Sequence, residues 1–396
     1  MQNQRILISG AGIAGPALAH WLSIYGFTPT LIERAPAFRA GGYMIDVWGT
    51  GYDLVERYGL LAAARQRGYI FDRVAFVDAE GRTLSSLSGA VMQRALGGRF
   101  FSIPRGDLAR SIYDLIEGKV EIFYGTTIAA LRQDAEGVDV EFSTGATRRF
   151  DLVVGADGLH SRVRELVFGD EMKFEKYLGY LAASFIADGY PHRDEATYVS
   201  FAAPGRQISR YAMRQNKSAF LLVFAQEEKP ALAPHDAAGQ KALIRARFAQ
   251  DGWEAPEILA LLDAADELYF DPVSQIRMPR WTAGRVALVG DAAHCPSLLA
   301  GAGSAYAMLG AYVLADALRD AAGDAARALP AYEQRLQGFM LRQQDVAARF
   351  AGSFTPKTQL GLALRNGVVN LMNLPLLGPW LARRMLGETF PLPDDR

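Results

Sequence analysis

Residues 5–33 read RILISGAGIAGPALAHWLSIYGFTPTLIE, and this stretch decides the fold. An apolar run of strand type at residues 5–9 leads directly into the glycine pattern at residues 10–15. Residues 16–25 are apolar or small and have the length of a helix, which Gly26 closes. A second strand-like run at residues 30–32 ends at Glu33. This order predicts a βαβ unit of the Rossmann type.

The glycine pattern is suited to a dinucleotide. One glycine makes the tight turn, one lets the backbone approach a pyrophosphate, and one lets the helix pack closely on the strand. The helix N-terminus then offers its amides to the phosphates. Glu33 lies 23 residues after Gly10, where a carboxylate accepts hydrogen bonds from a ribose and repels a 2′-phosphate, so FAD or NAD is predicted rather than NADP. The candidate contacts are Gly10, Gly12, Ala14, Gly15 and Glu33, with Arg34 either packed on the adenine or facing solvent.

Two later segments also place a turn directly after a strand. Residues 151–164 read DLVVGADGLHSRVR, and residues 284–303 read GRVALVGDAAHCPSLLAGAG. Asp291 follows the second of these strands at its carboxyl end, where ligands bind in an open α/β sheet, and can accept a hydrogen bond from a ribityl hydroxyl. A helix cap or turn residue is the alternative. Gly301 and Gly303 open the next helix, whose N-terminus would stabilise the negative charge of a reduced flavin.

With these three segments the sequence resembles the class A flavoprotein monooxygenases, which are FAD-dependent aromatic hydroxylases. The glycine turn, the DG segment and the GD segment match the family's signatures in the family's order, over roughly residues 1–175 and 275–320. The resemblance implies that Asp157 and Arg164 lie near the pyrophosphate and the path of the nicotinamide cofactor. A strand-to-helix turn capped by Ser161 is the alternative for both. Arg105, in the run RGDL, is implied to contact the flavin chain.

Residues 39–46, RAGGYMID, are similar to a loop of the tetracycline-inactivating branch of that family. The resemblance associates Arg39 with binding of the reductant and Asp46 with FAD. Arg39 can offer a fixed cation to a phosphate or to the flavin. A solvated ion pair within the loop is the alternative for these two residues.

The expected activity follows from the resemblance. NAD(P)H reduces FAD and leaves, reduced flavin adds O2 to form a C4a-hydroperoxide, and one oxygen atom passes to an aromatic or polyketide-like small molecule. The cofactor carries the oxygen chemistry, so no catalytic side chain is assigned. Two alternatives stay open: a FAD-dependent reductase or dehydrogenase without oxygen insertion, and a non-catalytic FAD-binding protein that sequesters a ligand. A halogenase is disfavoured because no two tryptophans stand two positions apart, as Trp-x-Trp-x-Ile requires.

The predicted fold class is α/β, with a Rossmann-like FAD-binding domain, an antiparallel-sheet substrate domain and C-terminal helices. We assign residues 1–70, 101–175 and 273–330 to the FAD-binding domain, residues 71–100 and 176–272 to the substrate domain, and residues 331–396 to a C-terminal helical segment. Strands are expected at residues 177–187, 196–201, 207–214 and 218–227, and helices at 241–250, 256–264 and 331–350.

The GD segment departs from the family pattern near the flavin. Leu298 stands where the family has proline, Pro296 comes early, and Ala305 replaces an asparagine. These differences leave the substrate class open. The candidate substrate-pocket residues are Met213, Phe224, Pro296 and Leu298, with plain core packing as the alternative for the first two.

Composition sets further limits. The chain has 396 residues, 50% hydrophobic and 21% charged, and a net charge of −1, which disfavours nucleic-acid binding. One cysteine and five scattered histidines disfavour disulfides and a metal site. The uncharged run 295–315 could span a bilayer by length, but its early proline and glycines favour a loop feeding a buried helix. We expect a cytoplasmic monomer or homodimer.

Overall fold

The computed structural model describes residues 4–38, 41, 43–233, 236–265, 267–374, 378, 380–381 and 388–392. A six-stranded sheet has the order β17-β18-β11-β1-β2-β7 and is parallel except for the β17–β18 pair. We call it the cofactor sheet. Its strands are β1 (Arg5–Ser9), β2 (Thr28–Glu33), β7 (Glu121–Tyr124), β11 (Leu152–Gly155), β17 (Thr282–Ala283) and β18 (Val286–Leu288).

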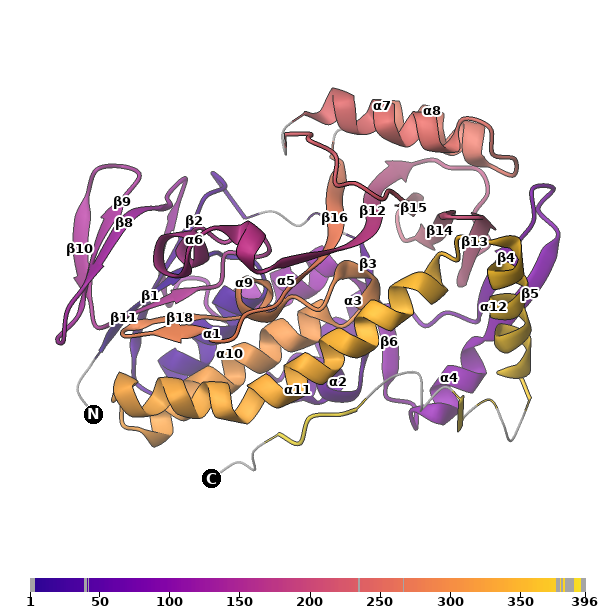
Figure 1. The fold of residues 1–396 in the computed structure, drawn as a ribbon. Coiled ribbons are helices and arrows are strands. Elements are labelled where there is room, and N and C mark those ends of the chain that lie inside the picture. The colour runs from indigo at the N-terminus through magenta and orange to yellow at the C-terminus, as the bar shows by residue number, and fades with distance from the viewer. Residues whose placement is uncertain are drawn as a thin grey trace.

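The predicted βαβ unit is present. Helix α1 (Ala14–Ile24) connects β1 to β2, and the two strands pair in parallel. Residues 6–8 of β1 are completely buried, as expected for a central strand covered on both faces. Helix α1 packs against α10 (Gly303–Asp320), which also contacts α2 (Gly49–Arg57) and α11 (Ala325–Phe354) (Figure 1).

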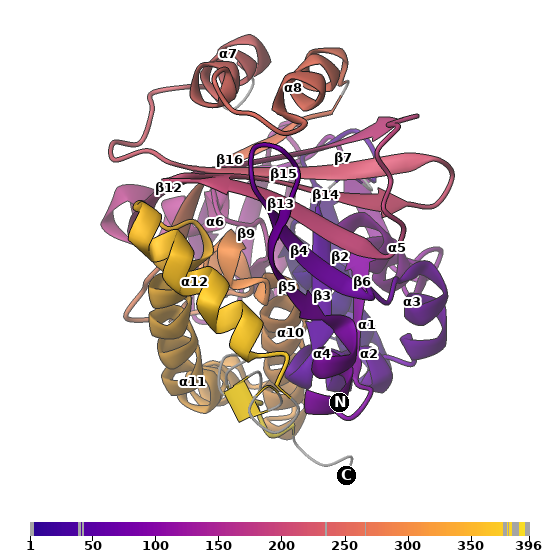
Figure 2. The ribbon, with the colours of Figure 1, turned by 90° about the vertical axis from the view of Figure 1, so that its right-hand side faces the viewer.

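A seven-stranded sheet of order β16-β12-β15-β14-β13-β4-β5 forms a second layer, which we call the roof sheet. Helices α7 (Ala237–Phe248) and α8 (Ala255–Ala264) lie over its outer face, and α12 (Gln359–Leu371) lies against β5 and β13 (Figure 2). Its strands are β4 (Arg73–Val77), β5 (Thr83–Ser88), β12 (Glu175–Asp188), β13 (Thr197–Ala203), β14 (Arg206–Met213), β15 (Lys217–Ala225) and β16 (Tyr269–Ile276).

The remaining elements connect and flank the two large sheets. A two-stranded sheet pairs β3 (Met44–Trp48) with β6 (Phe100–Pro104), and a three-stranded sheet has the order β10-β9-β8. The others are α3 (Leu61–Arg67), α4 (Gly89–Ala95), α5 (Arg105–Asp114), β8 (Ile128–Gln133), β9 (Val138–Phe142), β10 (Thr147–Phe150), α6 (Arg162–Phe168), α9 (Asp291–His294) and the 3-10 turns η1 (Glu171–Lys173) and η2 (Leu298–Ala300).

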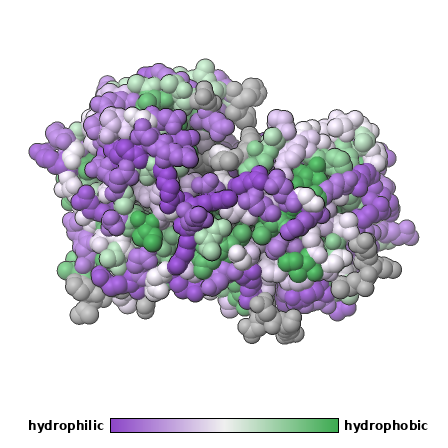
Figure 3. Space-filling view, turned by 180° about the vertical axis from the view of Figure 1, so that it is seen from behind, coloured by the Kyte–Doolittle hydropathy of each residue, from purple (hydrophilic) through white to green (hydrophobic). Residues whose placement is uncertain are grey.

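The predicted fold class is confirmed, and two predicted boundaries differ from the structure. The boundary placed before residue 273 falls inside strand β16. The long helix predicted from residue 331 begins at Ala325, because the Asp324 side chain caps it by accepting the Ala326 amide and Pro330 is accommodated within the helix. No helix among the described residues is both long and apolar enough to cross a bilayer. On the rear face, hydrophobic residues lie in separate patches among hydrophilic ones (Figure 3).

Candidate functional site

A cavity of about 1210 Å³ lies where the carboxyl ends of the cofactor-sheet strands meet the roof sheet. Its walls come from segments far apart in the chain: the turn after β1, the end of β2, the start of α5, the DG and GD segments, and the strands β12 and β16. The volume exceeds the usual range for one drug-sized ligand. The three sequence signatures therefore face one space.

The glycines of the first turn have distinct roles. Gly10 has a φ of +108°, and a Cβ there would lie 2.4 Å from the carbonyl oxygen of Ala156. A Cβ on Gly15 would lie 1.9 Å from the carbonyl oxygen of Gly10, so this glycine lets the helix approach the turn. A Cβ on Gly12 would meet only the Arg105 guanidinium, at 4.0 Å. Gly12 therefore leaves room toward the cavity, which it lines together with Ala14.

Glu33 lies at the end of β2, as predicted, and faces the cavity. Its carboxylate accepts hydrogen bonds from the backbone amides of Ala11 and Ala35, each at 2.8 Å. These bonds fix the orientation of the carboxylate, and its remaining lone pairs stay available for ribose hydroxyls. Arg34 also lines the cavity.

Asp291 opens helix α9 and lies in the cavity wall. Burial raises the pKa of its carboxyl, although the nearby Arg105 guanidinium acts in the opposite direction. Gly303 begins α10, and a Cβ on it would lie 3.8 Å from an oxygen of Asp291. Gly301 has a φ of +67°, in the left-handed region that favours glycine. A carboxylate and a helix N-terminus thus meet at this wall.

Residues 3–339 match the family described as FAD binding domain. The chain belongs to this family. An uncharacterised protein of Mycobacterium tuberculosis is 37% identical over 340 residues, covering 86% of this chain and 91% of that protein. A flavin-dependent monooxygenase of Legionella longbeachae is 32% identical over 367 residues, covering 91% and 92%. The crystal structure of tetracycline destructase Tet(51) matches with a TM-score of 0.83 at 31% identity, covering 99% of this chain and 100% of that one.

The predicted family, the class A flavin monooxygenases, is thereby confirmed, with FAD as its cofactor. The cavity fits that cofactor. Gly12 leaves open backbone beside a helix N-terminus, as a pyrophosphate needs. Glu33 lines the cavity with acceptor capacity suited to a ribose diol, and the buried Asp291 carboxyl is an acceptor suited to a ribityl hydroxyl. Arg105 adds a cation to the same wall.

The sequence offered two roles for Asp157, a contact with the cofactor and a part of the strand-to-helix turn, and the structure is compatible with both. It lines the cavity, yet its carboxylate accepts hydrogen bonds from the Ser161 hydroxyl at 2.5 Å and the Val163 amide at 3.0 Å. Ser161 in turn caps α6 by accepting the Arg164 amide. The turn-and-cap role is therefore present, and any contact of Asp157 with FAD adds to it.

Arg164 does not line the cavity, so we remove it from the candidate cofactor contacts. Its side chain is completely buried and donates to the Ala292 carbonyl at 3.0 Å, the Leu159 carbonyl at 2.5 Å and the Glu171 carboxylate at 2.5 Å. These partners bind both terminal nitrogens of the guanidinium inside the protein. Arg164 ends the DG segment, but the sequence gave no indication that Glu171 on η1 would be its partner.

Asp46 lies apart from the large cavity. It lines a second cavity of about 250 Å³ together with Trp48, Ala302 and Ala305, and accepts a hydrogen bond from the Ser102 hydroxyl at 2.5 Å. Ala302 is the N-cap residue of α10 and Ala305 lies in its first turn, so this smaller cavity also borders the start of α10. Arg39 lies outside the described residues.

Of the four candidate substrate-pocket residues, one lines the large cavity and three do not. Leu298 lines the large cavity. Pro296 is buried beside it, and its carbonyl accepts a hydrogen bond from Gln275. Met213 belongs to a buried cluster with Tyr211. Phe224 was predicted on the wrong face: it is completely buried against Phe248 of α7, on the outer side of the roof sheet, and leaves the candidate pocket.

Replacing Phe224 by alanine is therefore expected to lower the free energy of unfolding by about 3–5 kcal/mol, as for other buried phenylalanines. The affinity for FAD should stay within about twofold, since effects at distant, independent sites are separate. Urea unfolding and flavin titration measure the two quantities. A large loss of FAD affinity with little loss of stability would instead indicate that Phe224 belongs to the binding site.

The sequence interpretation missed four cavity residues near the roof: Tyr43, His160, Tyr269 and Asp271. The Tyr43 and Tyr269 rings lie 5.3 Å apart and bridge the two layers. Both Tyr269 and Asp271 come from β16, a strand that was not predicted because Pro272 interrupts its pattern. His160 stands inside the quoted DG segment and could have been chosen as a polar residue just after a strand end.

Proposed function

We propose that this protein is a monooxygenase that uses FAD, NAD(P)H and O2 to hydroxylate an aromatic or polyketide-like small molecule. The overall change is substrate–H plus O2, NAD(P)H and a proton to substrate–OH, NAD(P)+ and water. The observation that supports it most is the large cavity, where all three flavin signatures meet the roof sheet. The similarity to tetracycline destructase Tet(51) supports a polycyclic polyketide as the substrate class.

The chain's own residues hold and orient the cofactor. The turn from Gly10 to Gly15 would take the pyrophosphate, Glu33 the adenosine ribose, and Asp291 the ribityl chain. The N-terminus of α10 at Gly303 directs its partial positive charge into the cavity, where it would stabilise an anionic isoalloxazine. When bound, FAD supplies the electron transfer and oxygen activation that amino-acid side chains lack.

The roof sheet covers the reacting region of the cavity. Strand β16 brings Tyr269 over the cavity, where its ring meets that of Tyr43 from the cofactor half. Burial also raises the pKa of the Tyr43 and Tyr269 hydroxyls, so both stay neutral at physiological pH. With FAD and substrate bound beneath this cover, we expect water to be displaced, which limits side reactions.

NAD(P)H is proposed to dock transiently, because the sequence contains no second complete glycine pattern of the kind at residues 10–15. Arg39 remains our candidate for this contact. Residues 71–100 and 176–272 remain the proposed substrate domain, now extended through the end of β16 at Ile276.

The test begins with the purified protein and its visible spectrum. Bound FAD should colour it yellow, and phenolic and tetracycline-like compounds should then stimulate NADPH oxidation and O2 uptake, with a product heavier by one oxygen atom. Reduction of the substrate without O2 uptake would favour a reductase instead. Tight ligand binding without any NAD(P)H oxidation would favour a sequestering protein.

A further inference from the structure

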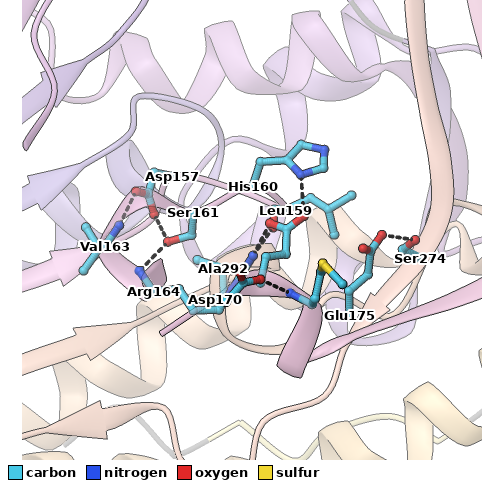
Figure 4. Close-up of polar contacts among 12 residues, drawn as sticks. Asp157, Leu159, His160, Ser161, Val163, Arg164, Asp170, Glu175, Ser274 and Ala292 are labelled. Atoms are coloured by element: carbon cyan, nitrogen blue, oxygen red, sulfur yellow. Dashed lines mark hydrogen bonds and ion pairs between the residues drawn. The ribbon is translucent and has the colours of Figure 1, made fainter. Parts of the chain in front are cut away.

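His160 lies between two carboxylates that come from different parts of the fold. Figure 4 shows His160 in the DG segment, near Ser161 and Arg164. Its Nδ1 is 2.8 Å from an oxygen of Glu171, which belongs to η1, and its Nε2 is 3.2 Å from an oxygen of Asp271, which belongs to β16 of the roof sheet. His160 itself follows β11 of the cofactor sheet. One imidazole thus connects the two layers of the molecule.

Two carboxylate partners require a proton on each ring nitrogen, because a carboxylate can only accept. The imidazole is therefore held as the cation. Hydrogen bonds to Asp271 and Glu171, in that order, raise the pKa of His160 to about 9, against an opposing effect of burial. His160 carries its positive charge throughout the physiological range.

The ion contacts continue into the cofactor half. Glu171 also pairs with the buried Arg164, whose guanidinium donates to the Ala292 carbonyl directly after Asp291. Charges therefore alternate from Arg164 to Glu171, His160 and Asp271. This series joins the GD turn, the DG segment and the roof.

Strand β16 is an edge strand, and among the described strands it pairs only with β12, up to and including its cavity end at Tyr269. Its carboxyl end is held to the cofactor half by the Ile276 amide, which donates to the Cys295 carbonyl. Its other end, at Tyr269 and Asp271, borders the cavity. There the contacts to the cofactor half include the His160 ion pair and the Tyr43–Tyr269 ring contact.

We propose that His160 is a positioning residue: an ionic latch that holds the cavity end of β16 against the cofactor half and so keeps FAD enclosed. The proposal rests on the FAD site described above. Without the cation, Glu171 and Asp271 would face each other as two like charges, and the edge strand would move outward. FAD would then dissociate more readily, although no contact between His160 and FAD is required.

The experiment compares His160→Gln, His160→Arg and a control, His192→Gln. His192 forms a similar pair with Glu257 at 3.1 Å, and its side chain is 46% exposed like that of His160, but it does not line the cavity. At about pH 7, His160→Gln should bind FAD about tenfold more weakly, a typical coupling between linked equilibria. His160→Arg, which restores the charge, and the control should stay close to the wild type.

A pH series gives a readout that a merely structural role would not produce. Because the folded pKa of His160 lies above the unfolded value of 6.5, its contribution is complete below that value and is lost as pH rises through about 9. Wild-type affinity should therefore fall between about pH 8 and pH 10, while His160→Arg keeps its affinity there. The other charges facing the latch, Arg164 and Lys229, are common to both proteins.

Hydrogen exchange in the FAD-free proteins supplies the second measurement. Backbone amides at the cavity end of β16 should exchange faster in His160→Gln than in His160→Arg, whether or not FAD binds. Equal exchange and equal FAD affinity in the two variants would overturn the latch while leaving the monooxygenase proposal intact. Failure of the wild type to bind FAD would overturn the cofactor site, and the exchange data would still decide on the latch.

Discussion

Asp291→Ala is expected to give a folded protein that is purified almost colourless. The Asp291 carboxyl lies in the cavity wall, and burial raises its pKa because the charged form has a cost in the folded state there. FAD would repay that cost through a charge-assisted hydrogen bond from a ribityl hydroxyl. Loss of such a bond is worth about 2–3 kcal/mol, so the Kd for FAD should rise roughly a hundredfold.

Two measurements separate binding from folding in this variant. Flavin fluorescence gives the Kd, and thermal unfolding without FAD should show a Tm equal to or above that of the wild type, because alanine removes an unfavourably buried charge. Asp251→Ala serves as the control: Asp251 pairs with Arg206 at 2.6 Å and does not line the cavity. It should lower the Tm and stay yellow. A yellow Asp291→Ala protein would contradict the proposed contact.

The cofactor half could be predicted because its rules are local. A glycine turn after a strand, an acid at the end of the next strand and an acid after a third strand each have positions fixed by the α/β architecture. Gly10, Glu33 and Asp291 accordingly all line one cavity. Resemblance added Arg105, which lies in the same wall.

The sequence predicted that the roof is a sheet, but not which side chains of its strands face the cofactor half. In β15 both sets of alternating residues are apolar: Leu222 and Phe224 contact the outer helices, while Val223 clusters with Leu299 on the inner side. Since helices cover one side and the cofactor half the other, the strand has no polar face to reveal its orientation. The prediction for Phe224 therefore chose the wrong set of alternating residues in β15: the neighbouring Val223, not Phe224, faces the inner side.

The ion contacts could not be predicted because they depend on distant partners. Asp271 meets His160 across 111 positions of sequence. Glu171 is close to Arg164 in the chain, but only the turn through η1 brings its carboxylate onto the buried guanidinium. Sequence spacing alone does not distinguish an arginine that faces a ligand from one that is paired inside the protein.

Gly15→Ala is expected to destabilise the whole protein, whereas Gly12→Ala should impair only cofactor binding. The new Cβ at residue 15 would lie 1.9 Å from the Gly10 carbonyl oxygen. Gly10 itself lies close to the backbone of Ala156, since a Cβ on Gly10 would be 2.4 Å from the Ala156 oxygen. Backbone on both sides leaves no flexible group to yield. The free energy of unfolding should fall by about 3 kcal/mol or more, at the upper end of the overpacking range.

At Gly12 a Cβ would have only the end of the Arg105 side chain nearby, at 4.0 Å, so Gly12→Ala should fold with a Tm near that of the wild type. Its methyl group would instead occupy the space in which a pyrophosphate approaches the backbone, and FAD affinity should fall about a hundredfold. Gly352→Ala in α11, where a Cβ meets nothing within 4 Å, is the control and should stabilise slightly. If Gly12→Ala bound FAD normally, the proposal that the pyrophosphate binds at this turn would be wrong. If only Gly15→Ala lost stability, the result would support the close packing of the helix but not the pyrophosphate site.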